Sequence, residues 1–179
     1  MPATLDTRLF SVAALMLTMA TPTAAQRPGG EPAPMVSLAG PRFGITLLSG
    51  GITDKLKKDS QIRVSPVITQ FGWQSEKRFQ TGRADVVGLT ELVVLVGGVE
   101  QNVVLPSLSW ILGMRTTSGF EFGLGPNVTP LGTAVVYVAG LNRKVGELNF
   151  PVNVSIVPSE SGVRMSVLTG FNAELFRRW

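Results

Sequence analysis

The chain contains no cysteine and no histidine. Without cysteine it can form no disulfide bond, and it has neither a thiol nucleophile nor a residue for lipid attachment behind a signal sequence. Without histidine it can build neither a Ser-His-Asp triad nor a histidine-ligated zinc site. These absences exclude the commonest nucleophilic and zinc-dependent enzymes. We therefore predict a protein that is not an enzyme and needs no cofactor and no metal.

Charge is also scarce, because only 16% of the residues are Asp, Glu, Lys or Arg. The net charge is +4, and the densest basic group is Lys55, Lys57 and Lys58. Proteins that bind nucleic acid usually carry a basic patch or stripe, so we expect no nucleic-acid partner. By contrast, 20 glycines, 12 prolines and abundant valine indicate many short strands separated by turns.

The N-terminal segment differs from the rest and has the layout of a secretory signal peptide. Arg8 precedes an apolar run over 9–20, and small residues close the segment at 23–25. That run is short for a membrane-spanning helix. Residues 26–40 are rich in proline and glycine without periodicity, which predicts a flexible lead-in. The predicted divisions are a signal peptide (1–25), this lead-in, a folded domain (41–172) and a C-terminal tail (173–179).

Turn signals recur within 41–172 at the interval expected for an all-β meander. Most connections are too short to hold a crossover helix, so neighbouring strands should pair antiparallel. One longer, charged connection covers 50–64, and we expect a helical turn at Thr53 to Lys58 within it. The eight predicted strands are 41–49, 65–79, 85–97, 103–115, 119–125, 131–142, 147–157 and 162–172.

The stretch LNFPVNVSIVP at 148–158 shows the alternation that several of these strands share. Its odd and even positions fall on opposite faces of an extended strand, so one face is apolar and the other polar. In a soluble barrel the apolar face points inward. In a barrel that crosses a bilayer it points to lipid, and the polar face lines the lumen. Strands 85–97 and 131–142 are apolar on both faces and do not reveal their orientation.

The composition of the polar face favours an enclosed lumen. It consists mostly of Gly, Ser, Asn and Gln, whereas a sheet face in bulk water usually carries long charged side chains. Its few charges are balanced in sign, as an internal salt-bridge network requires. The predicted network consists of Glu76, Arg78, Glu91, Arg115, Glu121 and Arg164.

The apolar face carries aromatic residues as well as Val, Leu and Ile. Lipid-facing strands place aromatic side chains in girdles at the two membrane interfaces. The girdle candidates are Trp73, Phe79, Trp110, Phe120 and Phe150.

In this patterning the chain resembles the small eight-stranded bacterial outer-membrane barrels, similar to outer membrane proteins A and X. The resemblance covers 41–172 and rests on strand number, signal peptide and alternation rather than on a motif. It implies an all-β fold, a single antiparallel up-and-down transmembrane β-barrel in the outer membrane of a bacterial cell envelope. It also implies that both termini lie in the periplasm and that 50–64 is the first external loop.

An eight-stranded barrel is just wide enough to be filled by its own side chains. We therefore predict a structural or surface-binding outer-membrane protein with a side-chain-filled lumen, not a wide pore. Its expected partners are the lipid bilayer and, through Lys55, Lys57 and Lys58, lipopolysaccharide or surface polymers. Two alternatives stay open. One is a soluble periplasmic barrel that carries an apolar ligand, and the other is a lipid-modifying outer-membrane enzyme with Glu76 or Glu121 as its base.

Overall fold

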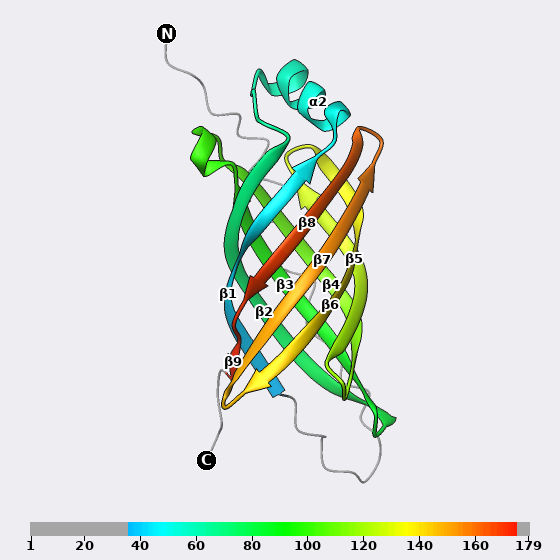
Figure 1. The fold of residues 1–179 in the computed structure, drawn as a ribbon. Helices are drawn as coiled ribbons and strands as arrows, with labels where there is room; N and C mark the ends of the chain where they lie inside the picture. Colours follow the sequence, from blue (N-terminus) through cyan, green and yellow to red (C-terminus); the bar gives the residue numbers. More distant parts are fainter. Residues whose placement is uncertain (1–35, 175–179) are drawn as a thin grey trace, which may run out of the picture. The chain divides into compact units, whose positions relative to one another are not determined.

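The computed structural model describes residues 36–174, which form one antiparallel β-barrel (Figure 1). Its elements are β1 (Val36–Leu48), α2 (Gly50–Ser60), β2 (Val67–Arg83), β3 (Val86–Gly97), η2 (Val99–Gln101), β4 (Leu105–Thr116), β5 (Phe120–Thr129), β6 (Gly132–Val145), β7 (Leu148–Ser159), β8 (Gly162–Gly170) and β9 (Ala173–Glu174). Consecutive strands pair with each other, and β1 pairs with both β2 and β8, so the sheet closes. This confirms the predicted all-β, eight-stranded up-and-down barrel, to which β9 adds a two-residue pairing.

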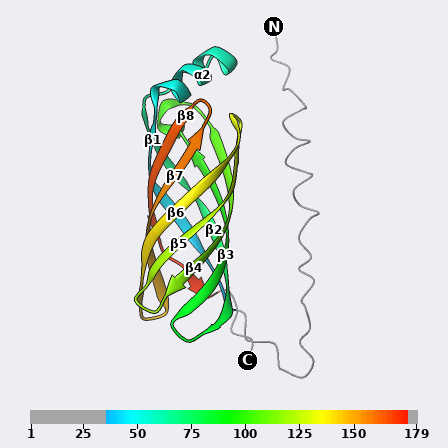
Figure 2. The same cartoon turned by 90° about the vertical axis from the view of Figure 1, so that its right-hand side faces the viewer.

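The helix α2 lies at one end of the barrel, which we call the upper end (Figures 1 and 2). Strand β1 begins and β8 ends at the opposite, lower end. The connections at the lower end are short turns, whereas the β1–β2 connection at the upper end holds the whole of α2. The predicted helical turn at Thr53 to Lys58 is therefore the middle of a longer helix. Between residues 36 and 174, no helix is both long and apolar enough to span a membrane.

The predicted strand boundaries hold to within a few residues in most places, and the clearest difference is at the start. Strand β1 begins at Val36, so Val36–Gly40 belong to the barrel and not to the lead-in. These residues pair with the lower half of β2, where Val36 lies opposite Arg78. Without them the backbone groups of that half of β2 would have no partner strand on this side. Their proline- and glycine-rich surroundings concealed this role in the sequence.

The C-terminal boundary is also shifted, because Ala173 and Glu174 were assigned to the tail. They form β9 and pair with Ala39 and Leu38 of β1. The predicted signal peptide (1–25), the rest of the lead-in and the end of the tail lie outside the described residues.

Side-chain orientation follows the alternation and puts the apolar face outside. Leu112, Leu124 and Leu141 each expose more than half of their surface, at 56%, 55% and 54%. On the inward face, Glu76 is fully buried and Arg42 is 2% exposed. A soluble protein hides its apolar face and exposes its charges, so this arrangement is the reverse of a soluble barrel. It excludes the apolar-ligand carrier with an inward apolar face.

The interior is nevertheless less polar than the sequence predicted. Strands β3 and β6, whose orientation the sequence did not indicate, point apolar side chains inward. Five buried residues from four strands form a cluster inside the barrel: Val93, Leu95, Ile111, Val136 and Val157. Because both faces of β3 and β6 are apolar, alternation could not indicate which residues fill the lumen.

Inward glycines allow the strands to curl tightly. A Cβ atom on Gly44 would lie 1.9 Å from the carbonyl oxygen of Val167, and one on Gly72 would lie 1.9 Å from that of Val94. No side chain fits at such distances, so these positions require glycine. The small residues of the polar face thus serve the close approach of neighbouring strands as well as the narrow lumen.

Candidate functional site

The lower half of the lumen holds an ion network centred on Arg115 of β4. Its guanidinium donates to both carboxylate oxygens of Glu76, from Nη1 to Oε1 at 2.7 Å and from Nη2 to Oε2 at 2.8 Å. Its Nε donates to Glu121 Oε2 at 2.6 Å. All three side chains are buried, and they come from β2, β4 and β5. Alternation places each on the inward face, and the antiparallel register brings Arg115 directly opposite Glu121.

Arg78 and Glu91 complete this network less tightly. Arg78 Nε donates to Glu76 Oε1 at 2.6 Å, and its Nη2 lies 3.5 Å from Asn149 Oδ1. Glu91 is 4% exposed, and its Oε1 lies 4.0 Å from Arg115 Nη2. That oxygen makes no hydrogen bond to any residue between 36 and 174. The structure thus brings five of the six predicted network residues together.

The sixth, Arg164, does not join the network. It lies near the upper end of β8, opposite Leu48 of β1 and Val157 of β7. Its Nη2 donates to Asn127 Oδ1 at 2.7 Å. The sequence pattern correctly placed Arg164 on the inward face, but height along the barrel depends on strand register, which alternation does not give.

Arg42 of β1 is a lumen residue that the sequence reasoning missed. It donates from Nε to Gln74 Oε1 and from Nη2 to Asn172 Oδ1, each at 2.8 Å. Nη1 donates to the Pro41 carbonyl at 2.8 Å. Because the first strand was predicted to begin at 41, Arg42 stood at its edge, where orientation is least clear. Starting the strand at Val36 would have placed Arg42 on the inward face.

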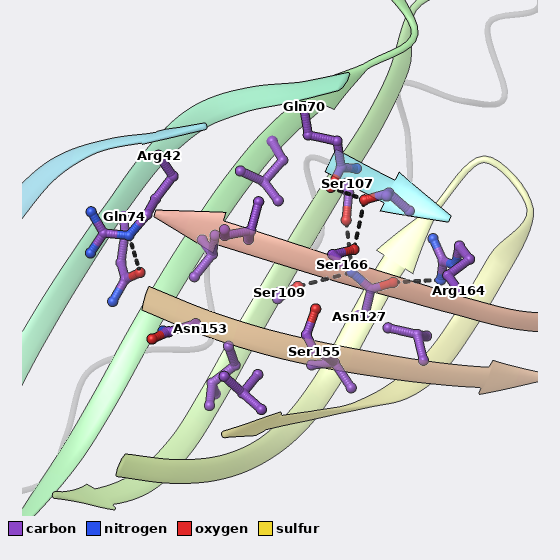
Figure 3. A pocket seen from close by; sticks show the side chains of 18 of the residues that line it. Arg42, Gln70, Gln74, Ser107, Ser109, Asn127, Asn153, Ser155, Arg164 and Ser166 are labelled. Carbon is purple, nitrogen blue, oxygen red and sulfur yellow. Dashed lines mark hydrogen bonds between the residues drawn. The ribbon is translucent and has the colours of Figure 1, made fainter. Parts of the chain in front are cut away.

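The upper half of the lumen contains neutral polar groups around Asn127 of β5 (Figure 3). The Asn127 amide donates to Ser107 Oγ at 2.8 Å and to Ser109 Oγ at 2.9 Å, while its oxygen accepts from Arg164. Nearby, Thr46 Oγ1 donates to Gln70 Oε1 at 2.6 Å and lies 2.6 Å from Ser166 Oγ. These contacts link β1, β2, β4, β5 and β8 across the barrel.

Two cavities lie inside the barrel. A cavity of about 50 Å³ lies in the lumen between Arg42 and Arg164 and is also lined by the apolar cluster around Val93. A second cavity of about 30 Å³ lies higher, beneath α2. Since a single water needs roughly 10–15 Å³ by this kind of measure, each cavity has room for a few waters or a small ion.

Helix α2 closes the upper mouth through an apolar face. Ile52 and Leu56 are four residues apart, so they lie on the same side of the helix, and each is only 1% exposed. They pack against Leu48 of β1 and Ile68 of β2. The backbone N–H of Gln61, in the left-handed conformation, donates to the Leu56 carbonyl and ends the helix.

The predicted basic loop lies on the other side of α2. Lys57 and Lys58 are exposed, and Lys55 is half-buried. Lys57 and Lys58 also occupy the last turn, where positive charge stabilises the helix dipole. Asp54 and Asp59 share the helix, so its own charges leave a net charge of only +1.

All five girdle candidates point outward, but they do not form the predicted pattern at strand ends. Phe79, Phe120 and Phe150 lie near the lower ends of β2, β5 and β7. Trp110 instead lies in the middle of β4, and its indole N–H donates to Thr90 Oγ1 at 2.8 Å. Trp73 lies within β2, away from either end. The two tryptophans thus lie away from the strand ends, whereas the three phenylalanines lie near them.

The carboxylates considered as catalytic bases are unsuited to lipid chemistry. Glu76 and Glu121 lie inside the barrel, both bonded to Arg115 and both at most 3% exposed. Lipid acyl chains contact the opposite face of these strands. In the described part of the chain, no group of three or more acidic residues is arranged to hold a metal ion.

A closed eight-stranded barrel with an apolar outer face is built to span a lipid bilayer, because it leaves no backbone edge unpaired and presents apolar side chains to hydrocarbon. The protein is thus an outer-membrane β-barrel. No protein-family model matches its sequence, and no curated protein matches it.

Solved structures with the same fold do exist. The crystal structure of Ail, the attachment invasion locus protein of Yersinia pestis, superposes with a TM-score of 0.51 at 12% sequence identity, covering 78% of this chain and 96% of Ail. A crystal structure of Ail with the heparin analogue sucrose octasulfate gives 0.48 at 10% identity, with the same coverage. Ail in a phospholipid bilayer nanodisc gives 0.47 at 11% identity, covering 78% of this chain and 99% of Ail. At this identity the first match establishes the shared fold and nothing further.

Proposed function

We propose that this protein is a closed outer-membrane barrel with a structural or surface-binding role and that it is neither a channel nor an enzyme. The observation that carries the proposal is the seating of α2, whose Ile52 and Leu56 are buried over the upper mouth. The buried ion network around Arg115, lower in the lumen, also supports the proposal. A solute entering from above would have to displace both.

The energetic cost of opening such a lumen supports this proposal. Breaking a buried ion pair by removing one partner typically costs about 3–5 kcal/mol, because the other charge remains buried and unpaired. The network joins Arg115 to Glu76 and Glu121 at hydrogen-bond distance. A conducting state would have to separate these partners, which favours the closed state.

Conductance across planar lipid bilayers tests the proposal directly. The refolded protein should give no steady current, and Leu56→Asp should leave this unchanged because the lower network still closes the lumen. A variant with Glu76, Arg115 and Glu121 all replaced by Ser, together with Leu56→Asp, serves as the positive control for an emptied barrel. A stable, ohmic current through the unaltered protein would contradict the proposal.

For the surface-binding role, we propose the exposed side of α2 as the contact region for anionic surface polymers, including lipopolysaccharide. The position of Lys57 and Lys58 supports this proposal. They are exposed and lie on the side of α2 opposite the buried Ile52 and Leu56. This assignment assumes that the upper end lies outside the cell, as in the family that the sequence resembles. The two aspartates on α2 limit the expected affinity, because they offset part of the lysine charge.

A further inference from the structure

Arg164 is an inward arginine without a carboxylate partner. Across residues 36–174, the ion pairs join Arg78 and Arg115 to glutamates, and none involves Arg164. Its one hydrogen bond goes to the neutral Asn127 oxygen. A charged group inside a membrane protein is costly unless it is paired, so an unpaired one indicates a missing partner or a function.

The charge balance of the lumen points in the same direction. Four buried or half-buried inward arginines face three inward glutamates, so one positive charge is in excess. The three glutamates, Arg78 and Arg115 form the lower network, and Arg42 lies next above it among neutral groups. Arg42 and Arg164 are thus the two inward arginines without an ion pair in the described chain. Arg42 donates hydrogen bonds from all three of its nitrogens, whereas Arg164 donates one, and both line the 50 Å³ cavity together with Glu91.

Hydrogen bonding around Arg164 leaves donors free. Elsewhere in the cavity wall, two acceptor atoms, Glu91 Oε1 and Asn153 Oδ1, also have no hydrogen-bond partner within 36–174. The Asn127 oxygen accepts from Arg164, and its amide group donates to Ser107 and Ser109. Those two hydroxyl groups therefore act as acceptors, and neither donates to another residue of the described chain. Gln70 is similar, since its oxygen accepts from Thr46 while its Nε2 has no partner within 36–174.

These free donors line one end of the same cavity (Figure 3). Arg164, Ser107, Ser109 and Gln70 all belong to its wall. A guanidinium group together with hydroxyl and amide N–H donors is the chemistry that binds an anion. The volume of about 50 Å³ suits an occupant as small as a monatomic anion with one or two waters. A phosphate-bearing lipid headgroup would not fit.

We propose that the upper lumen binds a small monovalent anion of the size of chloride, held by the Arg164 guanidinium and the hydroxyl groups of Ser107 and Ser109. The anion neutralises the excess charge and accepts hydrogen bonds from donors that otherwise have no acceptor. The site is part of the interior that holds the barrel together. Chloride should therefore stabilise the folded protein, whatever the outer surface of the barrel binds.

The test measures thermal unfolding of the full refolded protein in detergent as sodium gluconate is replaced by sodium chloride at constant ionic strength. Gluconate is too large for the cavity, so general screening is held constant. Above its dissociation constant, each tenfold rise in chloride should raise the ratio of folded to unfolded protein about tenfold. Arg164→Met should abolish this dependence, whereas Arg143→Met, an exposed arginine at the lower end of β6, should retain it.

A second variant protects the test in case Arg164→Met fails to fold. Ser107→Ala with Ser109→Ala keeps the arginine and removes two donors. The chloride concentration needed for a given gain in stability should therefore rise at least tenfold. In crystals grown with sodium bromide, an anomalous peak should lie within hydrogen-bond distance of Arg164. Equal stability in chloride and gluconate, or a chloride dependence that survives in Arg164→Met, would overturn the proposal and leave a cavity filled by water alone.

Discussion

Arg115 and Glu76 meet inside the barrel in a two-pronged contact, with donor–acceptor distances of 2.7 and 2.8 Å. The two residues come from β4 and β2, which are separated in the sheet by β3. This contact therefore passes over the inner face of β3 and does not follow the ladder of neighbouring strands. It ties together parts of the wall that backbone hydrogen bonds join only indirectly.

Removing one partner of this contact should destabilise the barrel strongly. We expect Arg115→Met to lower the free energy of unfolding by about 3–5 kcal/mol, because Glu76 and Glu121 would both remain buried without a counter-charge. Urea unfolding in lipid vesicles, followed by tryptophan fluorescence, measures the change. The double variant Arg115→Met with Glu76→Gln should recover part of the loss. A loss below about 1 kcal/mol would show that the network contributes little.

The seating of α2 can be tested without disturbing the strands. Replacing a buried leucine by alanine typically costs about 2–5 kcal/mol, so Leu56→Ala should release the helix from the mouth. Limited proteolysis should then cleave within 50–64 faster, while the barrel keeps its heat-resistant mobility in detergent gels. Lys58→Ala, at an exposed position on the same helix, is the matched control and should leave cleavage unchanged.

Gly72 should not tolerate a side chain. A Cβ atom there would meet the Val94 carbonyl oxygen at 1.9 Å, so β2 and β3 would have to move apart. We expect Gly72→Val to prevent refolding or to lower the yield of heat-resistant barrel several-fold. Gly50→Ala is a suitable control, because nothing lies within 4 Å of the corresponding Cβ position. Normal refolding of Gly72→Val would show that the strands can separate at little cost.

Glu100, in the η2 loop beyond the strands, should stay charged at a lower pH than an ordinary glutamate. Hydrogen bonds from the Thr69 hydroxyl and from its backbone N–H lower the pKa of Glu100 to about 2. Because this pKa is below the usual value, the contact is fully present above about pH 4.5 and is lost as the pH falls towards 2. The Thr69 amide shift in an NMR titration should report this midpoint, and Glu100→Gln should remove it. A midpoint near 4.5 would contradict the contact.

The lysines of α2 allow a test of polymer binding. Replacing Lys55, Lys57 and Lys58 by Gln should reduce retention on immobilised lipopolysaccharide severalfold at low salt, and the difference should vanish at high salt. Replacing Arg143 and Lys144 at the lower end by Gln is the matched control and should have little effect. Equal retention of both variants would mean that these lysines only stabilise the end of the helix.

Strand number, pairing direction and the outward apolar face could be predicted because they depend on local alternation and on connection length. LNFPVNVSIVP, for example, places Val152 outside and Asn153 inside, and the structure has the same arrangement. The height of Arg164 and the hidden position of Arg42 could not be predicted in this way. The height of Arg164 depends on register between strands, which is set by contacts far apart in sequence. Arg42 was missed because the start of β1 at Val36 is concealed by proline- and glycine-rich surroundings. Likewise, alternation cannot indicate which apolar side chains of β3 and β6 point inward, because both faces of these strands are apolar.

The seat of α2 combines segments that are distant in the chain. Leu48 and Ile68 flank the helix in sequence, but Leu105 at the start of β4 and Leu131 in the β5–β6 turn pack against the same cluster. We therefore expect α2 to reach its final packing only after β4 and the β5–β6 turn are in place. The rate at which 50–64 becomes protease-resistant during refolding would then measure how fast the upper end of the barrel is completed.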